Sequence, residues 1–505
     1  MTLLRSLTRI QSALASGGGS EGNTSGSSGG GGGGAFSRFL ARFYGWPPAK
    51  LDPGRDTAWL DGLRGVAAFL VLTYHYHLEW WTFYLEAPYG AKPEHWMQIW
   101  RLPFLRIFFC AGHAQVSVFF VLSGFVLSWS PLASVRRGQA DKLATTLSSA
   151  TFRRWLRLYV PCFAVGLWSI LELKWGLIDP PTIAKKDTIL GQLWDYVKAC
   201  ERFADPLKID RAENEFLHAY NWTMWTIPHE FAGSLLVFLL VLSVSRIRDY
   251  TRRTIVISSV TIICMLKARW TYWLFTYGVL LADYIRQNGG FIELHNPAAR
   301  LGWGVVMVFS LWLAGVPEHS PFYDRPGYEF LDSLVPSNYK DIETGGRYWW
   351  CWAGILFVTS ACHLVAVRRI FESSFTRYLG RVSYMLYVTH RVCYECVGRS
   401  FRQVLSNMFM TQKWSEELKA NYFTAGPIIG ILLWILSWTF LGPFAIFVAH
   451  WCEVFIDAPS VRLAKWVDQG FVKGFGAEKT ANHEEMVRLT AQEEATLTER
   501  EPRIA

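Results

Sequence analysis

The sequence predicts an all-α integral membrane protein in which about ten transmembrane helices form one bundle. Apolar residues make up 51% of the 505 positions, and 25 residues are tryptophan. Only 18% of the residues are charged, below the roughly 25% of ordinary soluble domains. Hydrophobic segments recur from Trp59 to Phe455 without a long polar interruption. These observations favour a single membrane domain over several soluble domains.

Two polar tails flank this domain, which we expect to cover residues 56–460. Residues 1–55 include a Gly/Ser tract with six consecutive glycines, and this predicts a disordered cytosolic tail. The first dozen residues carry no acid and in this respect are similar to a transit peptide. They lack the apolar core that a secretory signal needs, and we favour a cytosolic tail. Residues 461–505 become polar and rich in glutamate, and we expect a second cytosolic tail there.

Composition argues against several other classes of function. The formal charge of +9 is scattered between apolar segments, so the sequence does not predict a nucleic-acid-binding face. Most of the nine cysteines lie inside hydrophobic stretches, which makes a disulfide framework improbable. Cys393 and Cys396 form an isolated CxxC pair without a second ligand pair, so we expect no metal site.

Ten apolar segments are candidate spans, although several are shorter than the roughly 20 apolar residues that a bilayer needs or are interrupted by charge. All of them should be helices, because a helix satisfies its own backbone hydrogen bonds in lipid. The segments are residues 61–80, 108–130, 157–177, 222–245, 253–267, 270–285, 301–316, 348–367, 378–398 and 424–452.

Arginine-rich junctions predict the orientation of the bundle. Basic residues gather between spans two and three, four and five, and eight and nine, and these loops should be cytosolic. They are Arg136, Arg137, Lys142, Arg153 and Arg154, then Arg246, Arg248, Arg252 and Arg253, then Arg368, Arg369 and Arg377. Both termini would then lie in the cytosol. The membrane itself would be the plasma membrane or an endomembrane. Residues 179–220, assigned to the other side, carry six basic and eight acidic residues, but long loops follow the rule weakly.

Ionisable residues inside spans are the candidate functional groups. Each costs on the order of 3 kcal/mol at the bilayer centre unless it faces a polar interior. In the first span, Arg64 and His75 are eleven residues apart. Along an α-helix this spacing brings the two side chains to within roughly 20° of the same face and separates them by roughly 16 Å along the axis. One face should therefore present an arginine near the cytosol and a histidine at mid-depth.

The third and fourth spans carry the next candidates. Arg153, Arg154 and Arg157 are placed as membrane anchors would be, but guanidinium groups also bind phosphate oxygens bidentately. Glu230 follows His229 in an apolar setting, where a carboxylate needs a partner or a raised pKa. It is either an acid/base or orienting group, or an interfacial carboxylate in water.

His390 is the candidate of the ninth span. It lies seven residues after Ser383 on nearly the same face, whereas Arg381 points to the opposite side and is not expected to pair with it. A histidine in a membrane helix also commonly serves as a hydrogen bonder between helices, and that alternative stays open.

Five motifs in order are similar to those of the membrane acyltransferase-3 family. They are Leu60-Asp-Gly-Leu-Arg-Gly65 with His75, Phe119-Phe-Val-Leu-Ser-Gly-Phe125, Arg153-Arg-Trp-Leu-Arg157, Trp225-Thr-Ile-Pro-His-Glu230 and Ser383-Tyr-Met-Leu-Tyr-Val-Thr-His390. The resemblance runs from about Asp56 to about Pro459. It implies ten transmembrane helices, cytosolic acyl-CoA as co-substrate, and acylation of a hydroxyl or amine on a carbohydrate, lipid or small metabolite.

The same resemblance implies roles for individual residues. Arg64 and His75 match the arginine and histidine that the family requires. Acyl-CoA phosphates are expected at Arg64, Arg153, Arg154 and Arg157, and His75 is expected to be a general base or a transient acyl carrier. Glu230 and His390 would support catalysis. We expect the acceptor to contact Asn221, Trp225, His229 and Tyr387, with His229 standing where the family usually has an apolar residue.

A second class of function is also compatible with buried charge in ten helices. In a proton-coupled transporter of a small anionic metabolite, Arg64, His75, Glu230 and His390 would line a substrate or proton path. Carriers of this kind are commonly built from internal repeats, and the two halves of the sequence show no convincing repeat. An inactive relative acting as a scaffold is disfavoured because the full arginine and histidine set is present.

Overall fold

The computed structural model describes residues 35–46, 57–81, 86–92, 97–176, 183–208, 217–291, 293–318, 324–409 and 427–473. Within these ranges all regular structure is helical, apart from one isolated β-bridge between His218 and Asn221. The all-α prediction is confirmed. Most of the two predicted tails, residues 1–34 and 474–505, lies outside the described residues.

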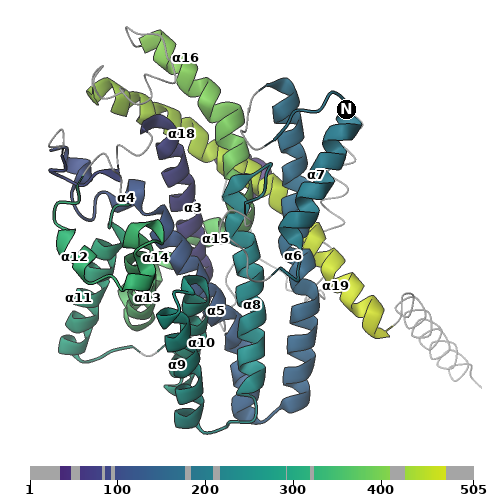
Figure 1. Cartoon of the computed structure of the whole chain (residues 1–505), viewed down its shortest axis with the longest axis vertical. Coiled ribbons are helices and arrows are strands. Elements are labelled where there is room, and N and C mark those ends of the chain that lie inside the picture. The colour runs from purple at the N-terminus through teal and green to yellow at the C-terminus, as the bar shows by residue number, and fades with distance from the viewer. Residues whose placement is uncertain are drawn as a thin grey trace, which may run out of the picture.

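The helices form one bundle in which α5, α6, α8 and α10 stand side by side while α15 and α18 cross behind them (Figure 1). The α-helices are Ala35–Tyr44 (α2), Ala58–Trp81 (α3), Ile107–Cys110 (α4), Gly112–Arg137 (α5), Ala140–Trp175 (α6), Ile189–Ala204 (α7), Thr226–Ser243 (α8), Tyr250–Leu266 (α9), Trp270–Gln287 (α10), Pro297–Ala314 (α11), Glu329–Ser333 (α12), Gly346–His363 (α13), Val365–Phe371 (α14), Ser374–Cys393 (α15), Arg399–Phe409 (α16), Pro427–Cys452 (α18) and Ala458–Lys473 (α19). Short 3-10 and π turns cover Ile99–Arg101 (η2), Trp222–Trp225 (η4), Ser337–Tyr339 (η5), Glu343–Gly345 (η6), Tyr394–Gly398 (η7) and Glu453–Asp457 (η8).

Two helix groups make up the core. In one group α3 packs along α15, and in the other α5 packs along α10; contacts between α3 and α5 join the groups. The buried apolar residues form two corresponding large clusters, one around Phe120 and Phe275 and the other around Leu72 and Leu386. The helices α5 and α10 approach each other closely at Gly124, since a Cβ there would lie 2.0 Å from the carbonyl oxygen of Phe275. The two groups meet where α3 contacts α5.

Fewer helices than ten are long and apolar enough to cross a bilayer by themselves. Among the described residues there are five, or six if the bent pair α13 and α14 counts as one span. The predicted spans in α3 and α15 are helices, but their polar residues lower their mean hydropathy, and α9 has only 17 residues. The number ten therefore stays a prediction.

The outward faces of several helices are suited to lipid. Only 22% of the most apolar part of α11 is buried, and only 33% of that of the continuous helical stretch Ile429–Val472, which begins in α18. Leu301, Val305 and Leu432 are exposed in these helices. Apolar helix faces of this extent are stable in lipid rather than in water. The helix α7 lies inside the loop predicted to be polar, yet it also exposes Leu190 and Trp194.

Two helix boundaries differ from the predicted spans for local reasons. The third span was expected to begin at residue 157, but α6 begins at Ala140, because the chain reverses at Gly138 in a left-handed conformation and the polar first half of α6 is still helical. The eighth span was expected to be continuous, but α13 and α14 meet at 103° at Leu364, whose backbone is extended. Hydropathy detects apolar length and is insensitive to both features.

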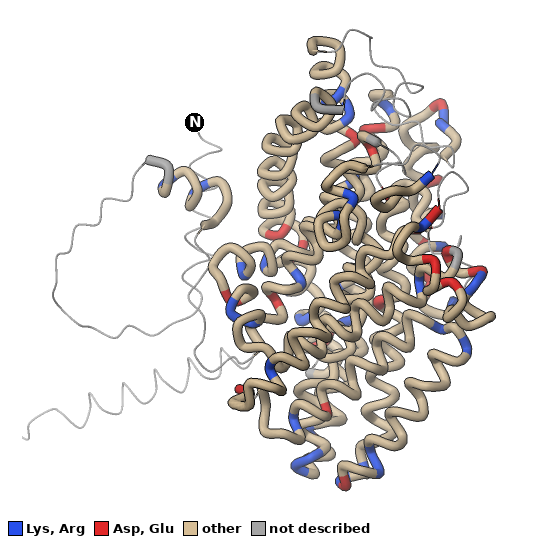
Figure 2. The backbone as a smooth tube through the Cα atoms, turned by 90° about the vertical axis from the view of Figure 1, so that its left-hand side faces the viewer, with Lys and Arg blue, Asp and Glu red and all other residues tan. Residues whose placement is uncertain are grey.

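Arginine and lysine mark one end of the bundle. Figure 2 shows blue residues at the lower turns, where Figure 1 places the α5/α6 and α8/α9 connections. Arg136 and Arg137 end α5, and Arg252 and Arg253 lie in the first turn of α9. We call this the basic end, and it is the end that the sequence predicts to be cytosolic.

Candidate functional site

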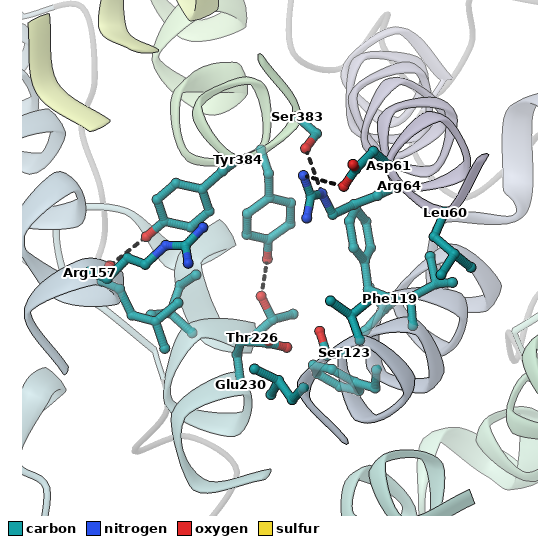
Figure 3. A pocket seen from close by; sticks show the side chains of 18 of the residues that line it. Leu60, Asp61, Arg64, Phe119, Ser123, Arg157, Thr226, Glu230, Ser383 and Tyr384 are labelled. Atoms are coloured by element: carbon teal, nitrogen blue, oxygen red, sulfur yellow. Dashed lines mark hydrogen bonds and ion pairs between the residues drawn. The ribbon is translucent and has the colours of Figure 1, made fainter. Parts of the chain in front are cut away.

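A pocket of about 310 Å³ lies between α3, α5, α6, α8 and α15, on the seam between the two core clusters (Figure 3). Its lining contains apolar residues such as Phe119 and Leu158. The polar and ionisable lining residues are Asp61, Arg64, Ser123, Arg154, Arg157, Thr226, Glu230, Arg381, Ser383, Tyr384, Tyr387 and Asp457. Four arginines thus face three carboxylates, an excess of positive charge that suits an anionic ligand.

Arg64 enters the pocket from α3 with a fixed orientation. Its Nε donates to Ser383 Oγ at 3.0 Å, and its Nη2 donates to the Gly380 carbonyl oxygen at 3.2 Å. Nη2 is also 3.4 Å from Asp61 Oδ1. The side chain remains 41% exposed, so the guanidinium is held in place and still reachable from the pocket (Figure 3).

Two glycines allow this arrangement by bringing the backbones of α3 and α15 into contact. A Cβ on Gly65 would lie 2.2 Å from the backbone nitrogen of Gly380, and a Cβ on Gly380 would lie 2.3 Å from the Asp61 carbonyl oxygen. No side chain fits at either position unless the helices separate. Gly65 and Gly380 therefore allow Arg64 to lie against Ser383.

Gly65→Ala is expected to lower the free energy of unfolding by about 1–3 kcal/mol, because the added methyl group meets backbone atoms that cannot turn away. Thermal unfolding in detergent measures the effect. Gly304→Ala is the matched control, since a Cβ at this position of α11 meets nothing within 4 Å. Equal unfolding midpoints for the two variants would contradict the packing argument.

Arg154 and Glu230 form an ion pair across the pocket wall. Arg154 Nη2 is 2.5 Å from Glu230 Oε1, and Arg154 Nε donates to Ser234 Oγ at 2.8 Å. The pair joins α6 to α8. The sequence leaves the partner of Glu230 open, and the structure shows that it is an arginine. The neighbouring His229 turns away, with its ring among Phe120, Trp225 and Trp270.

Arg157 and Arg153 take different directions although they are one helical turn apart. Arg157 lines the pocket beside Tyr384, opposite Arg64 (Figure 3). Arg153 is not among the lining residues; its Nε donates to the Ser149 carbonyl oxygen and lies 3.5 Å from Asp468 Oδ2 on α19. The structure thus brings Arg64, Arg154 and Arg157 together and leaves Arg153 outside.

His75 and His390 stack beyond the end of this pocket. Their ring centroids are 5.0 Å apart with planes inclined by 24°. Arg64 contacts Ser383 and His75 contacts His390, so the prediction that Arg64 and His75 share one helix face is confirmed. Tyr387, which lines the pocket, has its ring 5.6 Å from that of His390. The histidine pair is therefore one side chain removed from the lining.

The hydrogen bonding of His390 assigns its tautomer. Its Nδ1 lies 2.5 Å from the Tyr387 carbonyl oxygen, and a carbonyl oxygen only accepts, so Nδ1 carries the proton. The Nε2 lone pair is then free to accept, and this atom is buried without a hydrogen-bond partner among the described residues. A ring with a free nitrogen lone pair thus stacks on His75.

The remaining predicted acceptor residues divide into one that lines the pocket and three that do not. The Tyr387 hydroxyl donates to the Thr223 carbonyl oxygen and accepts from Thr226 Oγ1. Asn221 is fully buried and donates to the Val388 carbonyl oxygen at 3.2 Å, which ties the turn before α8 to α15. Trp225 packs near the Arg347 guanidinium. Asn221, Trp225 and His229 are not among the residues that line the pocket.

Sequence reasoning missed Asp457 and Arg381 as lining residues. Asp457 ends the π turn η8, whose wider winding shifts the helical phase so that a 3.6-residue period does not place it. Arg381 reaches His450 Nδ1 at 3.1 Å and is not paired with His390, as the sequence predicted. Within the described ranges, no group of three or more His, Cys, Asp or Glu residues is arranged to hold a metal ion.

Comparisons with known proteins give the site a chemical context. Residues 57–454 match the acyltransferase-3 family model, described as an acyltransferase domain. An O-acetyltransferase, PaAT-1, of Phomopsis amygdali is 26% identical over 83% of this chain and 86% of its own length. Acyltransferase R4 of a Phoma species is 22% identical over 67% of this chain and 82% of its own. Acyltransferase clz18 of Cochliobolus lunatus is 22% identical over 74% of this chain and 90% of its own length. No solved structure matches.

Proposed function

Since this chain belongs to the acyltransferase-3 family and is a membrane acyltransferase, we propose that it transfers a short acyl group, most simply acetyl, from acyl-CoA to a hydroxyl group of its acceptor. The choice of hydroxyl and acetyl is supported by the relative named as an O-acetyltransferase. The family assignment decides against the transporter alternative. In our proposal the basic end of the bundle faces the cytosol.

One observation carries the proposal: three arginines from α3 and α6 converge on one pocket whose far side leads to a stacked histidine pair. Guanidinium groups bind phosphate oxygens with charge-assisted hydrogen bonds. Arg64 is presented with an accessible edge, and Arg157 faces it from the opposite wall (Figure 3). The CoA phosphates would lie between these arginines, with the pantetheine arm directed past Tyr387 towards the histidines.

The rise of α3 agrees with the size of such a donor. Arg64 and His75 are eleven residues apart, which is roughly 16 Å along a helix. A pantetheine arm is an extended chain of that order, so phosphates at Arg64 are compatible with a thioester at His75. The thioester then meets the acceptor away from bulk water, where hydrolysis competes poorly.

His75 acts as the general base in the direct mechanism. The acceptor hydroxyl gives its proton to a nitrogen of His75 as its oxygen attacks the thioester carbonyl carbon, and the carbon–sulfur bond breaks when the tetrahedral intermediate collapses. The imidazolium returns the proton to the CoA sulfur. His390 stacks on His75 and would hold the ring of the base in place. The Arg154–Glu230 pair keeps the pocket rigid and limits its positive charge.

Comparison of host cells with and without the protein tests the function. Mass spectrometry of their metabolites and lipids should reveal at least one species heavier by one acetyl group in the expressing cells. Purified protein should release CoA from acetyl-CoA when the extract of the non-expressing cells is added. If neither acylated product nor CoA release is found, the proposed reaction is wrong.

A further inference from the structure

A second polar cluster lies at the end of the bundle away from the basic end. It consists of Tyr74, Glu86, His113, Glu318, Glu343 and Arg347, and we call it the distal network. The Tyr74 hydroxyl donates to Glu86 Oε1 at 2.9 Å and lies 3.3 Å from His113 Nε2. Arg347 Nη2 lies 3.1 Å from His113 Nδ1 and also pairs with Glu343. Glu318 Oε2 is 3.6 Å from His113 Nε2.

The hydrogen bonds of this network run in one direction. Arginine only donates, so His113 Nδ1 must accept from Arg347 and the His113 ring proton resides on Nε2. That nitrogen can then donate to the Tyr74 oxygen, and the Tyr74 hydroxyl in turn donates to Glu86. The chain from Arg347 to Glu86 is thus ordered and ends on a carboxylate.

Burial increases from the rim of the network to its floor. The side chains of His113, Glu343 and Glu318 are 20%, 21% and 31% exposed, whereas Arg347 is 0% and Glu86 is 3% exposed. Among the described residues, Glu86 Oε2 and the Nε and Nη1 atoms of Arg347 are buried without hydrogen-bond partners. Buried polar atoms normally have partners, so acceptor and donor capacity is left over at the floor.

The network adjoins His75 on the side away from the donor pocket. The Tyr74 ring centroid is 5.2 Å from that of His75, and the ring of the half-exposed Trp222 is also 5.2 Å from it. The donor pocket approaches the histidine pair through Tyr387 and His390. His75 therefore lies between two polar regions that open towards different ends of the bundle.

We infer that the distal network, with His75 at its inner edge, is the acceptor site and takes an uncharged molecule through its hydroxyl groups. The inference rests on the proposed acyl transfer and specifies the class of its second substrate. An anion would meet the carboxylates Glu86, Glu318 and Glu343. An ammonium group only donates and would leave the free N–H groups of Arg347 unpaired. A molecule with several hydroxyl groups both donates and accepts, so one hydroxyl can donate to Glu86 Oε2 while another accepts from Arg347.

The titration of Glu86 reduces the negative charge of this site. Burial, reinforced by Glu318, raises the pKa of Glu86 from 4.5 to about 7, against the lowering influence of His113, Tyr74 and Arg106. Near neutral pH the carboxyl group is therefore protonated in part of the molecules. A cationic acceptor gains less from such a group than from a fully ionised carboxylate.

The test uses three probes that share a cyclohexane ring: trans-1,2-cyclohexanediol, cyclohexylamine and cyclohexanecarboxylate. Each is added to the purified full-length protein with acetyl-CoA, up to its solubility limit, and CoA release is followed. The diol should increase the rate and the other two should not. Glu86→Gln and Tyr74→Phe should each raise the KM for the diol at least tenfold, with acetyl-CoA affinity and the unfolding midpoint close to those of the unmodified protein. Glu329→Gln, an exposed carboxylate of α12, is the matched control and should leave the diol-dependent rate unchanged.

Each other outcome overturns the inference. If the amine or the carboxylate increases the rate as much as the diol does, the acceptor is not selected through its hydroxyl groups. If the KM for the diol is unchanged in both variants, the distal network is not part of the acceptor site. Loss of acetyl-CoA binding in both variants would make the network structural. If no probe stimulates a protein that acylates a host metabolite, the acceptor class is wrong. If the unmodified protein releases no CoA and makes no acylated metabolite, the proposed function itself has failed.

Discussion

Replacing His75 with alanine is expected to lower turnover about a thousandfold, while acetyl-CoA affinity changes by no more than about threefold. Without the imidazole there is no group to take the acceptor proton, and an acyl-histidine route would lose its nucleophile as well. The donor contacts lie at the arginines, roughly 16 Å away along α3, and do not depend on this ring. Turnover, acetyl-CoA binding and the unfolding midpoint should be measured on the same preparation.

His295→Ala is the matched control for this substitution, because His295 is exposed in the loop between α10 and α11. Its turnover should equal that of the unmodified protein. Full activity in His75→Ala would reject the catalytic role. A variant that loses acetyl-CoA binding and stability together would show instead that the ring contacts of His75 with His390, Trp222 and Tyr74 hold the bundle together.

Periodicity along a single helix was sufficient for part of the site. The eleven-residue spacing of Arg64 and His75 placed both on one face, and the structure finds both against α15. The same reasoning separated Arg381 from His390, and His450 is the partner of Arg381. These predictions succeed because a regular helix fixes the relative direction of its side chains.

Contacts between helices were beyond the reach of the same reasoning. Glu230 has Arg154 as its partner because α6 packs beside α8, and neither helix encodes that neighbour. The distal network joins α3, α5 and α13 through Tyr74, His113 and Arg347, which are far apart in sequence. The bend at Leu364 and the π turn that brings Asp457 to the pocket depend on tertiary packing rather than on local propensity.

Arg157→Gln is expected to raise the KM for acetyl-CoA about 10- to 100-fold with a much smaller change in kcat. A charge-assisted hydrogen bond to an ionised group contributes about 1.5–3 kcal/mol, and the loss falls on binding because the substituted group is far from the reacting carbon. Glutamine keeps much of the side-chain volume and some polarity, so the pocket wall that Arg157 shares with Tyr384 should remain intact. Initial rates at varied acetyl-CoA, at fixed acceptor, give both constants.

Arg153→Gln provides the matched control, one helical turn away and within the same Arg-Arg-Trp-Leu-Arg segment. Because Arg153 faces Asp468 on α19 and does not line the pocket, its replacement should alter the KM for acetyl-CoA less than threefold. The dependence on salt distinguishes the two variants further. Added salt should weaken acetyl-CoA binding to Arg153→Gln as much as it weakens binding to the unmodified protein. It should weaken binding to Arg157→Gln less, because one phosphate contact is already missing there. An equal rise in KM for both variants would mean that charge at the basic end attracts acyl-CoA in general, and the donor site drawn from Arg64, Arg154 and Arg157 would have to be abandoned.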